Sequence, residues 1–194
     1  MYDEFIAEQL DEQHVLFRGH LPSSLVAQDA EFETLWSLHP SEFHEIMMHG
    51  RLVTTPRWQQ AYGKDYHYTK RTNIALAIPE TLQRFLAWGK DRIDPRLNGL
   101  LLNWYDGQLG HYIGKHRDST ANMIDGAPIV TISFGEQRAF RLRPWRGPGM
   151  VEFPTTNGTV FIMPYETNLA WTHEVPHSAR YQGRRISVTL RAFR

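Results

Sequence analysis

The sequence predicts an α+β fold in which helices support a small β-barrel or jelly roll. The chain has 194 residues, 41% of them hydrophobic, which is enough for one domain with a substantial core. After residue 99, short apolar segments alternate with turn residues, and strands at such regular spacing are typical of sandwiches and barrels. We therefore expect a single domain over residues 1–194, with residues 1–95 as mainly helical support and residues 96–194 as the β core.

Two stretches of the first half have helical periodicity. Residues 23–38 begin with two serines, which are good N-caps, and continue with apolar residues at near-helical spacing. Residues 78–93 place Pro79 near the first helical position, where proline is favoured, and then repeat apolar residues on one face. Residues 46–70 are rich in Gly, Pro and aromatic residues, so we expect a hairpin and loops there.

The second half contains seven candidate strands. Each is a short run rich in β-branched, aromatic or other apolar residues, and glycine-containing turns such as DGQLG, RGPG and TTNG separate several of them. The predicted strands cover residues 100–105, 127–135, 138–145, 150–154, 158–166, 168–175 and 184–193.

Composition narrows the class of protein. No apolar run is long enough to span a bilayer, and the acidic start MYDEFIAEQLDEQH lacks the features of a signal peptide. The chain has no cysteine, so a metal site would have to use His, carboxylates and water. We expect a cytoplasmic monomer without a membrane partner.

Charge is unevenly distributed along a chain of zero net charge. Residues 1–50 hold ten of the 21 acidic residues and one of the 21 basic ones, so their net charge is −9 and that of residues 51–194 is +9. Such asymmetry favours an anionic partner for the basic part, or two oppositely charged solvated faces that attract each other.

A possible metal site lies in the segment GKHRDS. If this segment is extended, His116 and Asp118 point to the same face and can bind one ion. A third ligand could come from His173 or His177 in NLAWTHEVPHSAR. Two histidines and one carboxylate leave coordination positions open, as in non-haem Fe(II) enzymes that bind a co-substrate and oxygen. Surface histidines are the alternative.

The last predicted strand, RRISVTLR, alternates two kinds of side chain. Ile186, Val188 and Leu190 form an apolar face, and the opposite face carries four polar residues: Arg185, Ser187, Thr189 and Arg191. Inside a small barrel two guanidinium groups would be costly without an anion. Arginine binds carboxylates well, so a metal with open positions beside these arginines points to 2-oxoglutarate.

These segments together resemble the AlkB family of Fe(II)/2-oxoglutarate dioxygenases, which repair alkylated nucleic acids. The family shows N-x-Y, then H-x-D, a distal His, and R-x-N-x-T-x-R, in that order; here they read NWY, HRD, WTHEVP and RISVTLR. The resemblance covers residues 46–192. It implies a double-stranded β-helix (jelly-roll) core, flanked by N-terminal helices and a nucleotide-recognition lid.

The resemblance also implies cofactors, a reaction and roles for individual residues. Fe(II), 2-oxoglutarate and O2 would drive oxidative dealkylation of N-alkylated bases in DNA or RNA. Asn103 and Tyr105 would bind 2-oxoglutarate, Arg185 its distal carboxylate, and Arg191 its keto-acid end. Iron would be held by His116, Asp118 and His173, with His173 preferred over His177 because WTHEVP and the spacing to Arg185 match the family.

A substrate lid is implied upstream, within residues 56–69. Arg57 and Tyr62 belong to the matching P-R-x-Q and Y-G elements, and Tyr66 and Tyr68 would stack on a flipped base. Met48 and His49 lie at a tip where some relatives wedge a hairpin into the duplex. Packing of aromatics on the barrel lip is the structural alternative for this segment. Four arginines of RAFRLRPWR could contact phosphates or simply be exposed: Arg138, Arg141, Arg143 and Arg146.

The chain departs from the family pattern in three places. Ser187 replaces the usual Asn, and the segment from Asn103 to His116 is longer than in some relatives. Thr120 stands where several relatives carry a carboxylate that reads the damaged base. These departures leave open an oxygenase acting on a protein side chain or small molecule, and a non-catalytic module with a vestigial barrel is a third hypothesis.

Overall fold

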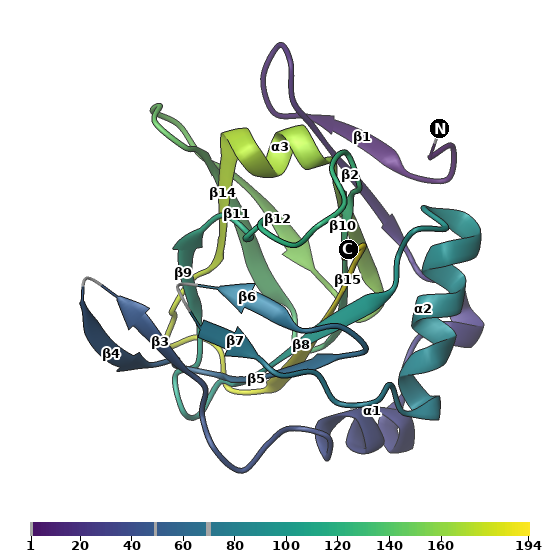
Figure 1. Ribbon diagram of the computed structural model, residues 1–194, viewed down its shortest axis with the longest axis vertical. Coiled ribbons are helices and arrows are strands. Elements are labelled where there is room, and N and C mark those ends of the chain that lie inside the picture. The colour runs from purple at the N-terminus through teal and green to yellow at the C-terminus, as the bar shows by residue number, and fades with distance from the viewer. Residues whose placement is uncertain (1, 49, 69–70) are drawn as a thin grey trace.

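Two antiparallel sheets form the body of the protein (Figure 1). The computed structural model describes residues 2–48, 50–68 and 71–194, except for the side chains of Met48, Tyr68 and Arg71. The major sheet has the order β1-β2-β13-β10-β15-β8-β5: β1 (Ile6–Gln9), β2 (Val15–His20), β13 (Thr159–Met163), β10 (Ile129–Gly135), β15 (Arg184–Arg191), β8 (Gly99–Asp106) and β5 (Trp58–Tyr62). The minor sheet has the order β12-β11-β14-β9: β12 (Val151–Thr155), β11 (Arg138–Pro144), β14 (Trp171–Val175) and β9 (Ile113–His116).

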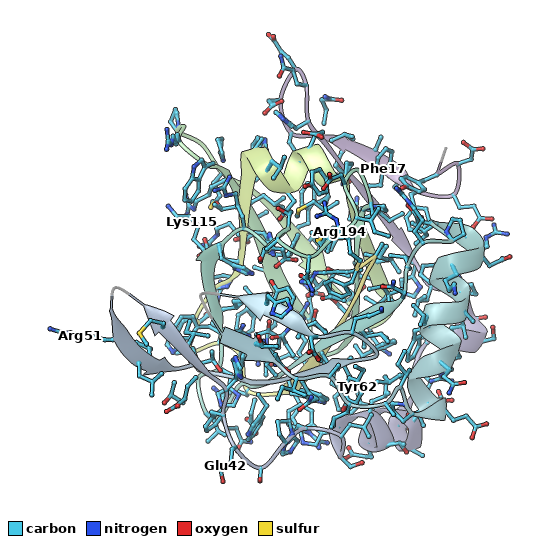
Figure 2. The ribbon with its side chains drawn as sticks, viewed as in Figure 1. Phe17, Glu42, Arg51, Tyr62, Lys115 and Arg194 are labelled. Atoms are coloured by element: carbon cyan, nitrogen blue, oxygen red, sulfur yellow. The ribbon has the colours of Figure 1, made fainter. Side chains whose placement is uncertain are left out.

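Two hairpins and a few helices complete the fold. The hairpins are β3 (Glu45–Met48) with β4 (Arg51–Thr54), and β6 (Tyr66–Tyr68) with β7 (Arg71–Asn73). The β3–β4 hairpin projects from the body, with Arg51 pointing outward (Figures 1 and 2). The helices are a 3-10 turn (Ser23–Leu25), α1 (Asp29–Trp36), α2 (Glu80–Arg92) and α3 (Tyr165–Ala170). Among the described residues no helix is long and apolar enough to cross a membrane.

The predicted alternation of the last strand is confirmed, and both of its faces are buried. Ile186, Val188 and Leu190 are inaccessible to solvent and lie in a core cluster. Apolar residues of the neighbouring strands β8 and β10 belong to the same cluster, because paired strands align their side chains on one face of the sheet. Residues of α1 and α2 belong to the same cluster. The opposite face of these strands is turned toward the minor sheet and carries the polar residues.

Helix α2 packs closely on this core because of one glycine. Gly89 lies within the helix, where glycine costs about 1 kcal/mol relative to alanine. A Cβ at this position would lie 2.5 Å from Leu190 Cδ1. The glycine therefore lets α2 approach β15, the strand that carries the buried arginines.

The first half contains more strands than expected. The helix predicted over residues 78–93 is α2. The helix predicted over residues 23–38 is shorter than expected: Ser23 begins a separate 3-10 turn, and α1 covers only Asp29–Trp36, with Gln28 as its N-cap. Two strands also lie in this half, since β1 pairs with β2 and β2 pairs with β13. Residues 58–62 form the edge strand β5 on β8. The predicted boundary near residue 95 therefore does not separate a helical support from the β core, since both halves contribute to the major sheet.

Candidate metal and diacid site

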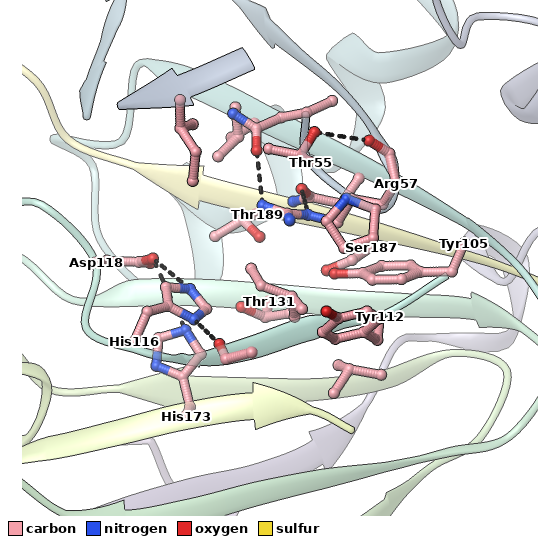
Figure 3. Close-up of a pocket in the computed structure, with 18 of the residues that line it drawn as sticks. Thr55, Arg57, Tyr105, Tyr112, His116, Asp118, Thr131, His173, Ser187 and Thr189 are labelled. Carbon is pink, nitrogen blue, oxygen red and sulfur yellow. Dashed lines mark hydrogen bonds and ion pairs between the residues drawn. The ribbon is translucent and has the colours of Figure 1, made fainter. Parts of the chain in front are cut away.

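Three side chains with metal-binding atoms meet between the two sheets. Strands β9 and β14 are paired in the minor sheet with His116 opposite His173, and Asp118 follows β9 by two residues. The Nε2 atoms of His116 and His173 lie 3.5 and 3.7 Å from Asp118 Oδ1. One ligand atom from each residue falls within 4.8 Å of the others (Figure 3). The structure thus selects His173, not His177, as the third member of the cluster.

Hydrogen bonds outside this cluster hold two of its members in place. His116 Nδ1 lies 2.8 Å from the Gly114 carbonyl, an arrangement that leaves Nε2 free for a metal. The Asp118 amide donates to Asn168 Oδ1 at 3.0 Å, and Asn168 Nδ2 donates to the Asp118 carbonyl at 3.1 Å. Sequence analysis missed Asn168, because its position on α3, five residues before His173, gives no local sign of this contact.

The protonation states of the cluster suit a bound metal. Burial alone would raise the pKa of Asp118, but Arg191, whose Nη2 lies 2.5 Å from Asp118 Oδ2, and the two imidazoles lower it well below its ordinary value. Burial, followed by the proximity of His116, lowers the pKa of His173 to about 3. Asp118 is therefore ionised and His173 neutral near pH 7, the protonation states that metal ligands need.

A second set of polar groups lines the cavity beside the cluster. This cavity of about 360 Å³ contains the polar face of β15, namely Arg185, Ser187, Thr189 and Arg191. Arg185 Nη2 donates to Ser133 Oγ at 2.8 Å. Within the described part of the chain, the Nε and Nη1 atoms of both Arg185 and Arg191 are buried without hydrogen-bond partners.

These unpartnered donors fit an anionic ligand with carboxylates at two positions. Unsatisfied buried guanidinium groups are expensive, so such donors indicate a missing acceptor. Burial lowers the pKa of Arg185, yet arginine stays charged in proteins. The donor set of two imidazoles and a carboxylate suits Fe(II), and the arginines suit a diacid such as 2-oxoglutarate. The residues present therefore fit both groups.

Strand register brings Asn103 and Tyr105 into the same cavity. Asn103 faces Ser187 across the β8–β15 pair, and Tyr105 faces Arg185. Arg57 Nε donates to Asn103 Oδ1 at 2.7 Å, which leaves the Asn103 amide NH₂ as the group that can donate to a ligand. The Tyr105 ring lies beneath the Arg185 guanidinium, 5.1 Å from Cζ to ring centroid.

The predicted lid residues separate into three groups. Arg57 and Tyr66 line the cavity, and Tyr66 packs on Arg191 at 4.6 Å and accepts a hydrogen bond from the Ser119 amide. Tyr62 is instead a core residue, 3% exposed, so the prediction that it contacts substrate is wrong. Its position on β5 turns its ring toward the helices. His49 lies outside the described residues, and so do the side chains of Met48 and Tyr68.

Most arginines of β11 are not available to phosphates. Arg138 is buried, donating to the carbonyls of residues 111 and 183 and to Glu136. Arg141 pairs with Glu152 and Glu174, and Arg143 also pairs with Glu174. Glutamates on the neighbouring strands, which a single strand does not reveal, neutralise Arg141 and Arg143.

Comparisons with known proteins agree with this arrangement. A sequence profile described as the 2OG-Fe(II) oxygenase superfamily matches residues 17–191. The chain is similar to the DNA oxidative demethylase ALKBH2 of Homo sapiens, with 26% identity over 95% of this chain and 74% of that protein. It is also similar to ALKBH2 of Mus musculus, with 28% identity over 95% of this chain and 81% of that protein. The solved structure of OsALKBH1 shares the fold, with a TM-score of 0.60 and 14% identity over 96% of this chain and 99% of that one.

Proposed function

The chain belongs to the 2OG-Fe(II) oxygenase superfamily, and from that premise we propose that it oxidatively dealkylates N-alkylated bases of DNA or RNA. Fe(II), 2-oxoglutarate and O2 are its cofactor and co-substrates. The observation that carries the proposal is one cavity containing the His116–Asp118–His173 cluster and two buried arginines with unpartnered donors. The similarity to the demethylase ALKBH2 supports nucleic acid as the substrate.

Different residues of the cavity would bind the iron and the 2-oxoglutarate. His116, Asp118 and His173 would hold the iron, and Arg185 would bind the distal carboxylate of 2-oxoglutarate. Arg191, next to Asp118, would lie at the keto-acid end. Two further groups would donate to 2-oxoglutarate or restrict its position: the amide of Asn103, oriented by Arg57, and the side chains of Tyr105 and Ser187.

Iron held by His116, Asp118 and His173 would supply the oxidation. With 2-oxoglutarate and O2, one oxygen atom would enter the substrate's N-alkyl C–H bond and the other would enter succinate, with release of CO2. The hydroxyalkyl group would then leave as an aldehyde and restore the base. Asn168 fixes the backbone of Asp118 through its pair of hydrogen bonds, and so acts as a positioning residue.

The two hairpins supply the substrate side of the cavity. Ile46 and Val53 of β3–β4 and Tyr66 of β6 line the cavity, together with Tyr112. An apolar and aromatic lining suits a base that has left its stack, because enzymes that modify bases must extrude them. We infer that β3–β4 and β6–β7 form the lid, with Tyr66 beside the flipped base.

We also propose that the enzyme works as a cytoplasmic monomer.

An oxygenase of proteins or small molecules is the second candidate. The ion pairs of Arg141 and Arg143 with glutamates favour it, since they reduce the basic rim available to phosphates. Thr120, in place of a carboxylate, also favours it.

A single assay separates the two candidates. The Fe(II)-loaded enzyme is incubated with 2-oxoglutarate, O2 and oligonucleotides carrying methylated adenine or cytosine, and formaldehyde and succinate are measured. If the enzyme dealkylates the oligonucleotide, the oligonucleotide should increase succinate above the amount formed without it. This increase should equal the amount of formaldehyde released. Succinate formation that no oligonucleotide increases, with no formaldehyde, would reject nucleic acid as substrate and leave the oxygenase assignment standing.

A further inference from the structure

A second, open cavity adjoins the metal cluster. It is lined by Lys115, Arg117, Trp145 and Leu169, and also by His116 and Asp118. Lys115, His116 and Asp118 line the first cavity as well, so the two cavities share a wall at the metal ligands. A strand of nucleic acid whose base enters the first cavity would have its neighbouring nucleotide near the second.

The aromatic residue of this second cavity is exposed but held in place. Trp145 follows β11 and is 45% exposed, and its amide donates to the Ala170 carbonyl at 2.8 Å. The Arg117 guanidinium lies 4.0 Å from the Trp145 ring centroid, and Arg117 Nη1 donates to the Leu169 carbonyl at 2.7 Å. A large ring fixed before binding loses little conformational entropy when a ligand packs on it.

The charge of the second cavity suits a phosphate next to that ring. Lys115 and Arg117 are its basic lining residues, and Asp118, its acidic one, already pairs with Arg191. Among the described residues no carboxylate pairs with Lys115 or Arg117, in contrast to Arg141 and Arg143 on β11 of the same sheet. Lys115 is an exposed residue of β9 and lies at the left edge of the molecule in Figure 2.

We propose that Trp145 stacks on the base next to the target nucleotide in the same strand, with Lys115 and Arg117 at the intervening phosphate. This inference rests on the proposed function and deepens it. Stacking on an aromatic ring requires an unpaired base, so the geometry points to single-stranded nucleic acid, or a strand opened on both sides of the lesion, as the substrate. Because every base has a π-face, the subsite would tolerate any base sequence.

The test compares three substrates in three enzymes and one control variant. One substrate is a short single-stranded oligonucleotide with a central methylated adenine, and the others replace its 5′ or 3′ neighbour by an abasic nucleotide. The enzymes are the natural protein, Trp145→Ala and Trp145→Phe, all Fe(II)-loaded. Ile6→Ala is the matched control, because Ile6 is an exposed apolar residue (59%) on β1, an edge strand of the other sheet.

The proposal predicts a specific pattern of KM values for formaldehyde release. In the natural protein and the Ile6→Ala control, removing one of the two neighbouring bases should raise KM about 5- to 150-fold, equivalent to about 1–3 kcal/mol. In Trp145→Ala the same removal should change KM less than twofold, because the stacking partner is gone. Trp145→Phe should retain most of the effect, since it keeps an aromatic face.

The possible failures can be told apart. If the natural protein releases formaldehyde but its KM depends on the neighbouring bases as strongly in Trp145→Ala, the subsite is wrong and the proposed function stands. If the natural protein is insensitive to both abasic replacements, the subsite is again wrong. If it dealkylates no oligonucleotide while still forming succinate, both the function and the subsite are overturned.

Discussion

Replacing Arg185 with lysine tests the diacid site most directly. Arg185 is 1% exposed, and its three guanidinium nitrogens have different environments. Nη2 is engaged with Ser133 Oγ, whereas Nε and Nη1 are buried without partners within the described part of the chain. Two donors therefore remain for the distal carboxylate of 2-oxoglutarate. Lysine keeps the positive charge but offers a single nitrogen, so it cannot reproduce a two-point contact.

The expected magnitude follows from the loss of one charge-assisted hydrogen bond. Such a bond contributes about 1.5–3 kcal/mol, which corresponds to about a 10- to 150-fold increase in the Kd for 2-oxoglutarate. The analogue 2-oxobutyrate lacks the distal carboxylate, so it shows whether the weakening comes from the loss of the Arg185–carboxylate contact. Its Kd should hardly change in Arg185→Lys, because the group that Arg185 contacts is absent.

Anaerobic calorimetric titration of the Fe(II)-loaded enzyme measures both ligands without turnover. Arg138→Lys is the matched control, because Arg138 is also buried and lies near the same Tyr105 ring, but its donors bind Glu136 and two backbone carbonyls. The control should lower the melting temperature and leave the Kd for 2-oxoglutarate unchanged. An Arg185→Lys variant that binds 2-oxoglutarate as tightly as the natural protein would refute the reasoning, as would equal weakening for the two ligands.

Three further predictions concern the metal cluster and stability. Asp118→Ala should abolish iron retention, measured by metal analysis. It should also lower the melting temperature, because Arg191 loses its buried partner. A variant that keeps stoichiometric iron would contradict the assignment of Asp118 as a metal ligand. Asn168→Leu should weaken Fe(II) binding about 10- to 100-fold, as is typical when a group supporting a metal ligand is removed. Asn168→Asp keeps one acceptor for the Asp118 amide and should therefore bind Fe(II) more tightly than Asn168→Leu. Unchanged Fe(II) affinity in both variants would assign Asn168 to folding alone. Asp94 has a lowered pKa, caused first by its hydrogen bond with Arg96, so it stabilises the fold above its unfolded pKa of about 4. Asp94→Asn should therefore lower the melting temperature by about 2–4 °C at pH 7, with the difference vanishing as the pH falls below about 4; a difference that persists at pH 2 would exclude this pair as its cause.

The residues along a single strand were predictable because side-chain direction alternates there. The pattern of β15 indicated that Arg185 and Arg191 share a face opposite Ile186, Val188 and Leu190, and the structure places them so. The H-x-D spacing likewise predicted that His116 and Asp118 converge. These features depend on local geometry, which the sequence contains directly.

Only the tertiary structure decided which distant residues meet. The segment NLAWTHEVPHSAR offered both His173 and His177, the family resemblance favoured His173, and the pairing of β14 with β9 brings His173 to the cluster. The Asn168 contacts to Asp118, the burial of Tyr62 and the glutamate partners of β11 are also contacts between segments far apart in the chain. Composition and periodicity determine which face of an element is polar, whereas strand order and register determine what that face meets.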